Sequence, residues 1–182
     1  MRRESRCSPH PQNRAGVDAV IAAGVDVMAH TAPTREFAEY TPEQLARFKA
    51  QGIALIPTLS LFTTIVLDPA VTARITTVTV NQLRQFSENG GAVLFGTDIG
   101  FIKLYDTTLE YELMHRALSE RQVLASLTTN PAQFFKAAKK GRVERGFDGD
   151  IVVLDGDPMS DVRNLAKIVY TIRAGQIIYQ KP

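Results

Sequence analysis

Short apolar runs alternate with segments of helical spacing along the first two thirds of the chain. The apolar runs are 25–29, 53–57 and 92–95, and the helical patterns cover 14–24, 41–52 and 68–89. Short apolar runs of this kind, bounded by glycine or proline, are typical of strands buried on both faces. Helices and strands that alternate with short connections predict an α/β fold with a parallel sheet and right-handed crossovers.

The pattern changes in the last third of the chain. Helices are predicted at 108–118 and 120–128, and strands at 150–154, 167–172 and 176–179, with the last two strands joined in a hairpin at 173–175. We therefore expect two domains, residues 1–140, of which 1–13 are irregular, and a β-rich tail, residues 141–182.

Composition excludes several classes of protein. The 182 residues carry a formal net charge of +2, which provides no field to attract nucleic acid or an anionic membrane. No apolar run approaches the roughly 20 residues of a membrane span. The single cysteine, Cys7, suits a reducing compartment, and residues 1–8 lack the apolar core of a secretory signal. We expect a cytoplasmic protein as the chain stands, with a leader upstream of Met1 left open.

Two polar residues follow apolar runs directly. His30 follows 25–29, and Asp98 lies just beyond the run 92–95. The carboxyl ends of parallel strands meet at the edge of the sheet where ligands bind. Imidazole and carboxylate are common donors to a catalytic divalent metal, which needs about three protein ligands. The alternatives are that Asp98 caps a turn and that His30 is a hydrogen-bonded structural residue.

The other histidines are weaker candidates. His10 lies about one αβ repeat before His30, although the residues before it are not a strand sequence, and His115 lies within a predicted helix. Two Asp-Gly-Asp triplets, 148–150 and 155–157, are interpreted as turns because they flank a predicted strand and lack EF-hand spacing. Phosphate-binding loops, nucleophile elbows and the His-Glu-x-x-His motif are absent.

Four motifs in order give the sequence a family resemblance. They are GVDVMAH at 24–30, GTDIG at 96–100, TNPA at 129–132, and the segment 141–158 with its final DGDP. From about residue 10 to its end, the chain resembles the carboxyl-terminal half of the amidohydrolase superfamily, in particular its imidazolonepropionase-like and Xaa-Pro-dipeptidase-like branches.

The resemblance implies a fold and a chemistry. The fold would be part of a (β/α)8 barrel of the TIM type, about strands six to eight, with a tail from the small β-sandwich that both chain ends build. His10, His30 and Asp98 would bind one or two divalent ions, of the zinc type in the complete family, and Asp98 would also move the proton. The reaction would be hydrolysis of a C–N bond in a small amide, cyclic amide or dipeptide. Thr58, together with Tyr105, is expected to contact the substrate, from the pocket-lining segments 58–64 and 99–106.

The sequence also departs from this family. It has no His-x-His pair, which the family uses at strand one, and no counterpart of the strand-four ligand. The alternatives are therefore a non-catalytic remnant without metal, or an interaction subunit that forms a homo-oligomer or completes its barrel with a second polypeptide. A third possibility is a small independent α/β binding domain that uses the Asp98 edge without metal.

Overall fold

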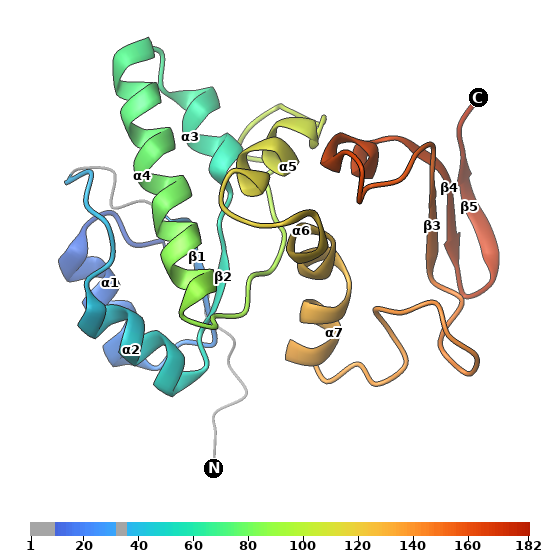
Figure 1. Ribbon diagram of the computed structural model, residues 1–182, viewed down its shortest axis with the longest axis horizontal. Helices are drawn as coiled ribbons and strands as arrows, with labels where there is room; N and C mark the ends of the chain where they lie inside the picture. The colour runs from blue at the N-terminus through green and yellow to red at the C-terminus, as the bar shows by residue number, and fades with distance from the viewer. Residues whose placement is uncertain (1–9, 32–35) are drawn as a thin grey trace. The chain divides into compact units, whose positions relative to one another are not determined.

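The computed structural model describes residues 10–31 and 36–182, which divide into two units (Figure 1). The first unit ends at Lys103, and the second comprises residues 104–182. Most of the segment 1–13 that we expect to be irregular lies outside the described residues, as do residues 32–35 of the loop after His30. The boundary expected near residue 140, between the domain 1–140 and the β-rich tail 141–182, falls inside the second unit and stays a prediction.

The first unit is an α/β structure with parallel strands, as predicted. Strand β1 pairs in parallel with β2, and Leu55 of β2 forms a further parallel bridge with Val93. Strand β2 therefore lies between β1 and the segment around Val93. The elements are α1 (Arg14–Ala23), β1 (Val27–Ala29), α2 (Pro42–Gln51), β2 (Ala54–Ile56), α3 (Leu59–Ile65) and α4 (Pro69–Glu88).

Local sequence signals explain where the helices of this unit begin and end. Thr41 and Gln44 form a reciprocal capping box at the start of α2, as predicted, and satisfy two backbone donors that a helix end leaves unpaired. Gly24 and Gly52 follow α1 and α2 with φ of 66° each, a left-handed conformation that glycine adopts without steric cost.

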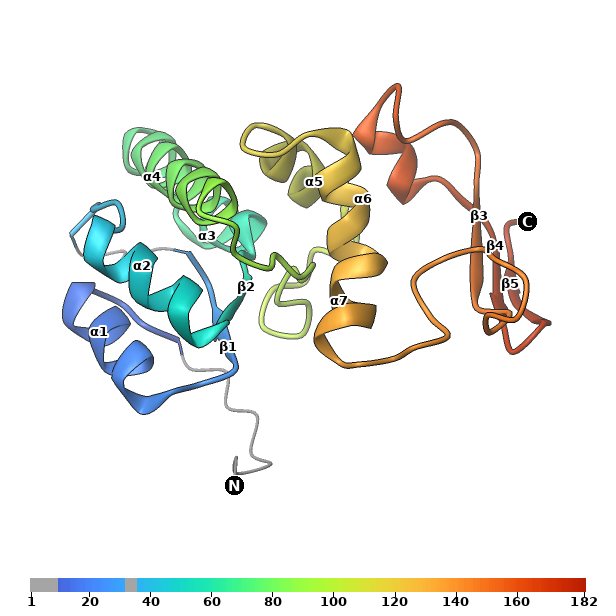
Figure 2. The same cartoon turned by 60° about the horizontal axis from the view of Figure 1, so that its bottom comes forward.

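Apolar side chains of the helices and strands form the core of the first unit. In Figures 1 and 2, helices α1, α2 and α4 lie on the same side of strands β1 and β2. The rings of Phe48 in α2 and Phe86 in α4 meet edge to face, with centroids 5.5 Å apart. The largest fully buried apolar side chains of this unit are Val17, Ile21, Met28, Phe48, Ile53, Leu55, Leu59, Leu83 and Phe86.

Two details of this unit differ from the sequence prediction. The apolar run 92–95 makes a single bridge at Val93 instead of a strand. Strand β2 ends at Ile56, and the next residue, Pro57, has no backbone N–H to donate. The pairing between β2 and the run 92–95 therefore cannot continue beyond the bridge at Val93. Most of the segment 58–64, expected only as pocket lining, belongs to helix α3, with Thr58 at its N-cap. Gly96 lies so close to β2 that an added Cβ would be 2.5 Å from Cγ2 of Ile56.

The second unit contains three helices, a 3-10 turn and an antiparallel sheet with the order β3, β4, β5. The predicted hairpin is confirmed, with Ala174 and Gly175 in left-handed conformations between β4 and β5. The elements are α5 (Thr108–His115), α6 (Glu120–Leu127), α7 (Thr129–Phe134), β3 (Ile151–Leu154), η1 (Val162–Ala166), β4 (Ile168–Arg173) and β5 (Gln176–Gln180).

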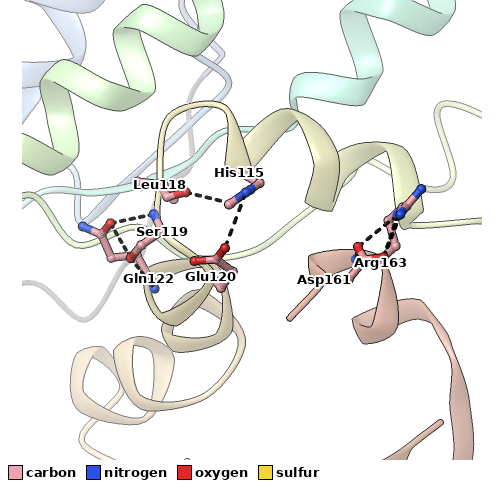
Figure 3. Close-up of polar contacts among 7 residues, drawn as sticks. All are labelled: His115, Leu118, Ser119, Glu120, Gln122, Asp161 and Arg163. Carbon is pink, nitrogen blue, oxygen red and sulfur yellow. Dashed lines mark hydrogen bonds and ion pairs between the residues drawn. The ribbon is translucent and has the colours of Figure 1, made fainter. Parts of the chain in front are cut away.

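Polar contacts join the ends of these helices (Figure 3). His115 donates from Nδ1 to the carbonyl oxygen of Leu118 at 3.2 Å, and its Nε2 lies 3.7 Å from Oε1 of Glu120. Ser119 and Gln122 form the capping box predicted for α6. His115 therefore has a structural environment at the α5 to α6 turn, in agreement with its prediction as a helix residue.

The Asp-Gly-Asp segments also serve the fold. The ammonium group of Lys140 pairs with Asp148 and with Asp150, and Asp157 accepts a hydrogen bond from the backbone N–H of Met159. These contacts agree with their interpretation as turns. Among the helices within 10–31 and 36–182, none combines the length and apolarity needed to cross a membrane.

Candidate metal and proton-transfer site

Three predicted site residues of the first unit have an unusual backbone conformation. His30 (φ 68°) directly follows β1, Thr58 (φ 48°) follows β2 after Pro57, and Asp98 (φ 62°) follows the segment paired at Val93. A side chain with a Cβ in the left-handed region costs about 1–3 kcal/mol, and such residues cluster at functional sites. Only three other non-glycine residues of the described chain have a positive φ: Phe37, Lys136 and Ala174.

The imidazole of His30 lies at the centre of a hydrogen-bonded group. Its Nε2 is 2.7 Å from Nδ1 of His10, and its Nδ1 is 2.5 Å from Oγ1 of Thr58. The ring of Phe62 in α3 packs edge to face against the same imidazole, with centroids 5.9 Å apart. His30 is only 7% exposed, so its ring is fixed by these neighbours. The structure thus brings together three of the residues predicted for the site.

Burial and charge both act on the pKa of His30. Desolvation lowers this pKa most, the nearby His10 lowers it further, and the charge of Asp98 raises it. The net effect is a lowered pKa, so His30 is neutral at neutral pH. A neutral imidazole keeps one lone pair, which is the form that accepts a proton or coordinates a metal.

The carboxylate of Asp98 does not cap the turn that follows it. The turn uses the backbone carbonyl of Asp98 instead, which accepts hydrogen bonds from the N–H groups of Phe101 and Ile102. Within the described chain no backbone N–H donates to the Asp98 carboxylate, whereas Asp106 accepts one from Thr108 at 2.8 Å. The turn-cap alternative for Asp98 is therefore not supported. The charge of Asp98 acts on His30, so this carboxylate belongs to the same neighbourhood.

Tyr105 is the remaining predicted site residue. It belongs to the second unit, where its side chain is 77% exposed. The proposed contact with substrate stays a prediction, as does the same role for Thr58.

The donors of this neighbourhood fit a zinc-type ion in kind but fall short in number. Imidazole nitrogens and a carboxylate are suitable ligands. However, the described residues contain no group of three or more His, Cys, Asp or Glu side chains arranged to hold an ion. The His10 and His30 nitrogens are hydrogen-bonded at 2.7 Å, closer than the roughly 3.3 Å between two nitrogens on one tetrahedral zinc.

No sequence pattern singles out two further residues of this neighbourhood. Thr31, next to His30, is 2% exposed, and its hydroxyl has no hydrogen-bond partner within the described residues. Phe62 lies inside the segment 58–64 that is expected to line the pocket, and the helical spacing from Thr58 places it beside His30. Position within that segment is the only signal that could have found Phe62.

Several solved structures are similar to the chain in fold. The solved structures that resemble the chain include a protein of Bifidobacterium longum provisionally assigned as a prolidase, with 26% identity and a TM-score of 0.80 over 97% of this chain and 47% of that one. A Xaa-Pro dipeptidase crystallised with methionine in its active site has 23% identity and a TM-score of 0.76 over 94% and 44% of the two chains. The ochratoxinase of A. niger has 18% identity and a TM-score of 0.76 over 97% and 42%.

These relatives are longer than the chain. The chain spans less than half the length of each of the three structures. None of the curated proteins matches the chain significantly. The model of the amidohydrolase family matches residues 12–179, which is nearly the whole sequence. The chain therefore belongs to the amidohydrolase family.

Proposed function

We propose that the chain supplies the carboxyl-terminal part of a metal-dependent hydrolase site that cleaves a C–N bond in a small amide, cyclic amide or dipeptide. The observation that supports this most directly is the contact between the ring nitrogens of His10 and His30 at 2.7 Å, with the charge of Asp98 acting on the same His30 imidazole. Membership of the amidohydrolase family and the Xaa-Pro dipeptidase among the similar structures give the reaction class.

In this proposal the first unit is part of a (β/α)8 barrel. Strands β1 and β2 correspond to strands six and seven, and the segment around Val93 to strand eight. The support is the parallel pairing in chain order, with α2 between β1 and β2 and with α3 and α4 before Val93. The β3 to β5 sheet would then belong to a sandwich that a further segment completes.

His10, His30 and Asp98 would contribute donors to an ion that further donors complete, and such an ion would lower the pKa of a bound water molecule toward neutrality. His30 stays neutral and directs its Nε2 toward the position occupied here by His10. Asp98 accepts a proton from the attacking water as the water oxygen bonds to the carbonyl carbon. It then returns that proton to the leaving nitrogen as the C–N bond breaks, which balances the hydrolysis.

The remaining donors would come from outside residues 1–182. Three observations support this part of the proposal: the absence of a His-x-His pair, the incomplete donor group among the described residues, and the partial coverage of each similar structure. A further segment of the same protein or a second polypeptide would supply them.

An interaction subunit without activity of its own is the second candidate, and the β3 to β5 sheet favours it. Adjacent residues of a strand point to opposite faces, and Ile177 and Ile178 of β5 are 60% and 61% exposed. Val152 and Val153 of β3 are 51% and 38% exposed. Apolar side chains thus lie uncovered on both faces of the sheet, as is typical of a surface that another polypeptide covers.

Zinc binding and hydrolysis by the purified 182-residue chain test these proposals. We expect less than one tightly bound zinc per chain, weaker binding still in His30→Gln and Asp98→Asn, and no turnover of dipeptides or cyclic amides. His115→Gln is the matched control, because His115 lies in the second unit and contacts Glu120. Equal zinc binding by all four proteins would overturn the metal proposal, and stoichiometric zinc with turnover would overturn the need for further donors.

A further inference from the structure

We infer that Thr58 is a positioning residue that fixes the tautomer of His30, with the proton on Nδ1 and the lone pair on Nε2. This inference concerns the same site as the proposed function, and only its consequence for metal binding rests on that function. The evidence is a chain of three hydrogen bonds. It runs from Nδ1 of His10 to Nε2 of His30, from Nδ1 of His30 to the hydroxyl of Thr58, and from that hydroxyl to the carbonyl oxygen of Pro57.

The hydroxyl of Thr58 is not used as a helix cap. Thr58 occupies the N-cap position of α3, where a threonine hydroxyl usually accepts a hydrogen bond from a backbone N–H of the first turn. Here Thr58 has a left-handed backbone, and its side chain makes no cap hydrogen bond. The hydroxyl is instead 2.8 Å from the carbonyl oxygen of Pro57 and 2.5 Å from Nδ1 of His30.

Counting protons gives the direction of each hydrogen bond. A hydroxyl carries one proton, and a carbonyl oxygen can only accept. The Thr58 proton therefore goes to Pro57, and Thr58 must accept at its contact with Nδ1 of His30. His30 accordingly carries its proton on Nδ1. In a neutral ring Nε2 is then the acceptor, so Nδ1 of His10 donates to it at 2.7 Å.

The surroundings keep the imidazole in this orientation. Thr58 and His30 are 3% and 7% exposed, so water is largely excluded from their contact. The rings of Phe62 and His10 meet the imidazole edge to face, at interplanar angles of 81° and 76°. Turning the imidazole by half a rotation would place ring carbons where both nitrogens now make hydrogen bonds. One ring orientation and one tautomer are therefore selected together.

A fixed tautomer has a direct consequence for the site. With Nδ1 committed to Thr58, the lone pair of Nε2 always faces His10, where an incoming ion or proton would be bound. Histidine ligands of metals generally donate their second ring N–H in this manner, and loss of the outer partner costs about 10- to 100-fold in metal affinity. Thr58 would thus act on the site through His30 without touching the reacting atoms.

Nitrogen NMR of the metal-free chain tests the tautomer directly. The sequence has three histidines, so three ring systems appear in a long-range ¹H–¹⁵N correlation spectrum, and His10→Gln and His115→Gln identify the third as His30. At pH 8.5, well above the ordinary histidine pKa of about 6.5, we expect His30 to show a protonated Nδ1 and an unprotonated Nε2. A His30 protonated on Nε2 in the unaltered chain would overturn the inference.

Two variants separate the hydroxyl from the shape of the side chain. Thr58→Ser keeps the hydroxyl and should keep the tautomer, whereas Thr58→Val keeps the branched shape and should shift the proton toward Nε2. An unchanged tautomer in a folded Thr58→Val would overturn the inference. If Thr58→Val does not fold, the unaltered chain and Thr58→Ser still decide, because both must show the Nδ1 proton.

Zinc titration of the same samples separates this inference from the proposed function. We expect zinc affinity to fall about 10- to 100-fold in Thr58→Val and to recover in Thr58→Ser. If the unaltered chain has the expected tautomer but binds no zinc, the positioning role stands and the proposed metal function fails. If the unaltered chain binds zinc but Thr58→Val keeps both the tautomer and the zinc affinity, the positioning role fails and the metal function stands.

Discussion

His30 and Asp98 lie at the ends of the two segments that flank β2, and the negative charge of Asp98 acts on the imidazole of His30. Both residues have left-handed backbone conformations, with φ of 68° and 62°. The two side chains come from segments far apart in the sequence, yet the electrostatic state of one depends on the other.

Removing the charge of Asp98 should therefore change the titration of His30. The carboxylate raises the pKa of His30 and opposes burial, which lowers it, so Asp98→Asn should lower this pKa further. The measurement is an NMR pH titration of the His30 ring in the metal-free chain. Asp18→Asn, which alters a carboxylate paired with Arg47 in the same unit, is the control and should leave the titration unchanged.

The close approach of Gly96 to β2 predicts a specific loss of stability. A methyl group at Gly96 would lie 2.5 Å from Cγ2 of Ile56, so Gly96→Ala should reduce the free energy of unfolding by about 1–3 kcal/mol in urea denaturation. The same substitution should cost less in an Ile56→Ala background, which removes the clashing atom. Gly100→Ala is the control: its added methyl meets open space, so its cost comes from a φ of 117° and should not depend on Ile56. Additive effects of Gly96→Ala and Ile56→Ala would contradict the contact.

The lowered pKa of Asp161 should make the free energy of unfolding depend on pH in the acid range. Hydrogen bonds from the side chain and the backbone N–H of Arg163 lower the pKa of Asp161 to about 2 (Figure 3). Because the folded pKa is below the ordinary value of about 3.9, the stabilisation is complete above that value and is lost as the pH falls through about 2.

The comparison of Asp161→Asn with the unaltered chain measures this effect. We expect the unaltered chain to be the more stable at pH 5, and the difference in free energy of unfolding to shrink as the pH is lowered toward 2. Asp155→Asn, an exposed carboxylate beyond β3, serves as the control for the loss of a charge. A difference that stays constant over this range would exclude titration of Asp161 as its cause.

Because apolar residues of the β3 to β5 sheet are exposed, we expect copies of the chain to associate with one another. We expect the sedimentation coefficient of the purified chain to rise with protein concentration, because exposed apolar strands pair with other chains. Ile177→Thr combined with Ile178→Thr should shift the chain toward the monomer while preserving strand propensity. Gln180→Thr, a polar position of the same strand, is the control. A monomer at every concentration would contradict self-association.

The sequence signals that worked best are local ones. The capping boxes of Thr41 and Ser119 involve residues three apart, and the hairpin at Ala174 depends on two turn residues, so the pattern alone predicts them. His30 and Asp98 could be proposed as site residues because each follows an apolar run. These predictions needed no knowledge of the rest of the fold.

Features that depend on distant partners could not be predicted in this way. The run 92–95 looks like a strand, but β2 ends at Ile56 and leaves it only the bridge at Val93. Helix α3 lacks a side-chain cap because the hydroxyl of Thr58 bonds to His30, 28 residues earlier. His10 follows residues unlike a strand, so its place beside His30 was suggested only by its spacing of about one αβ repeat and by the family resemblance.

Three residues with left-handed backbone conformations, His30, Thr58 and Asp98, supply the side chains of the site one at a time. Each of the three polar side chains, His30, Thr58 and Asp98, follows a paired segment of the sheet, and the backbone N–H of His30 still donates to the carbonyl oxygen of Ile56 in β2. Exchange of one such side chain leaves the register of the neighbouring strands intact. Single substitutions at these positions should therefore change the chemistry of the site while the sheet beneath it persists.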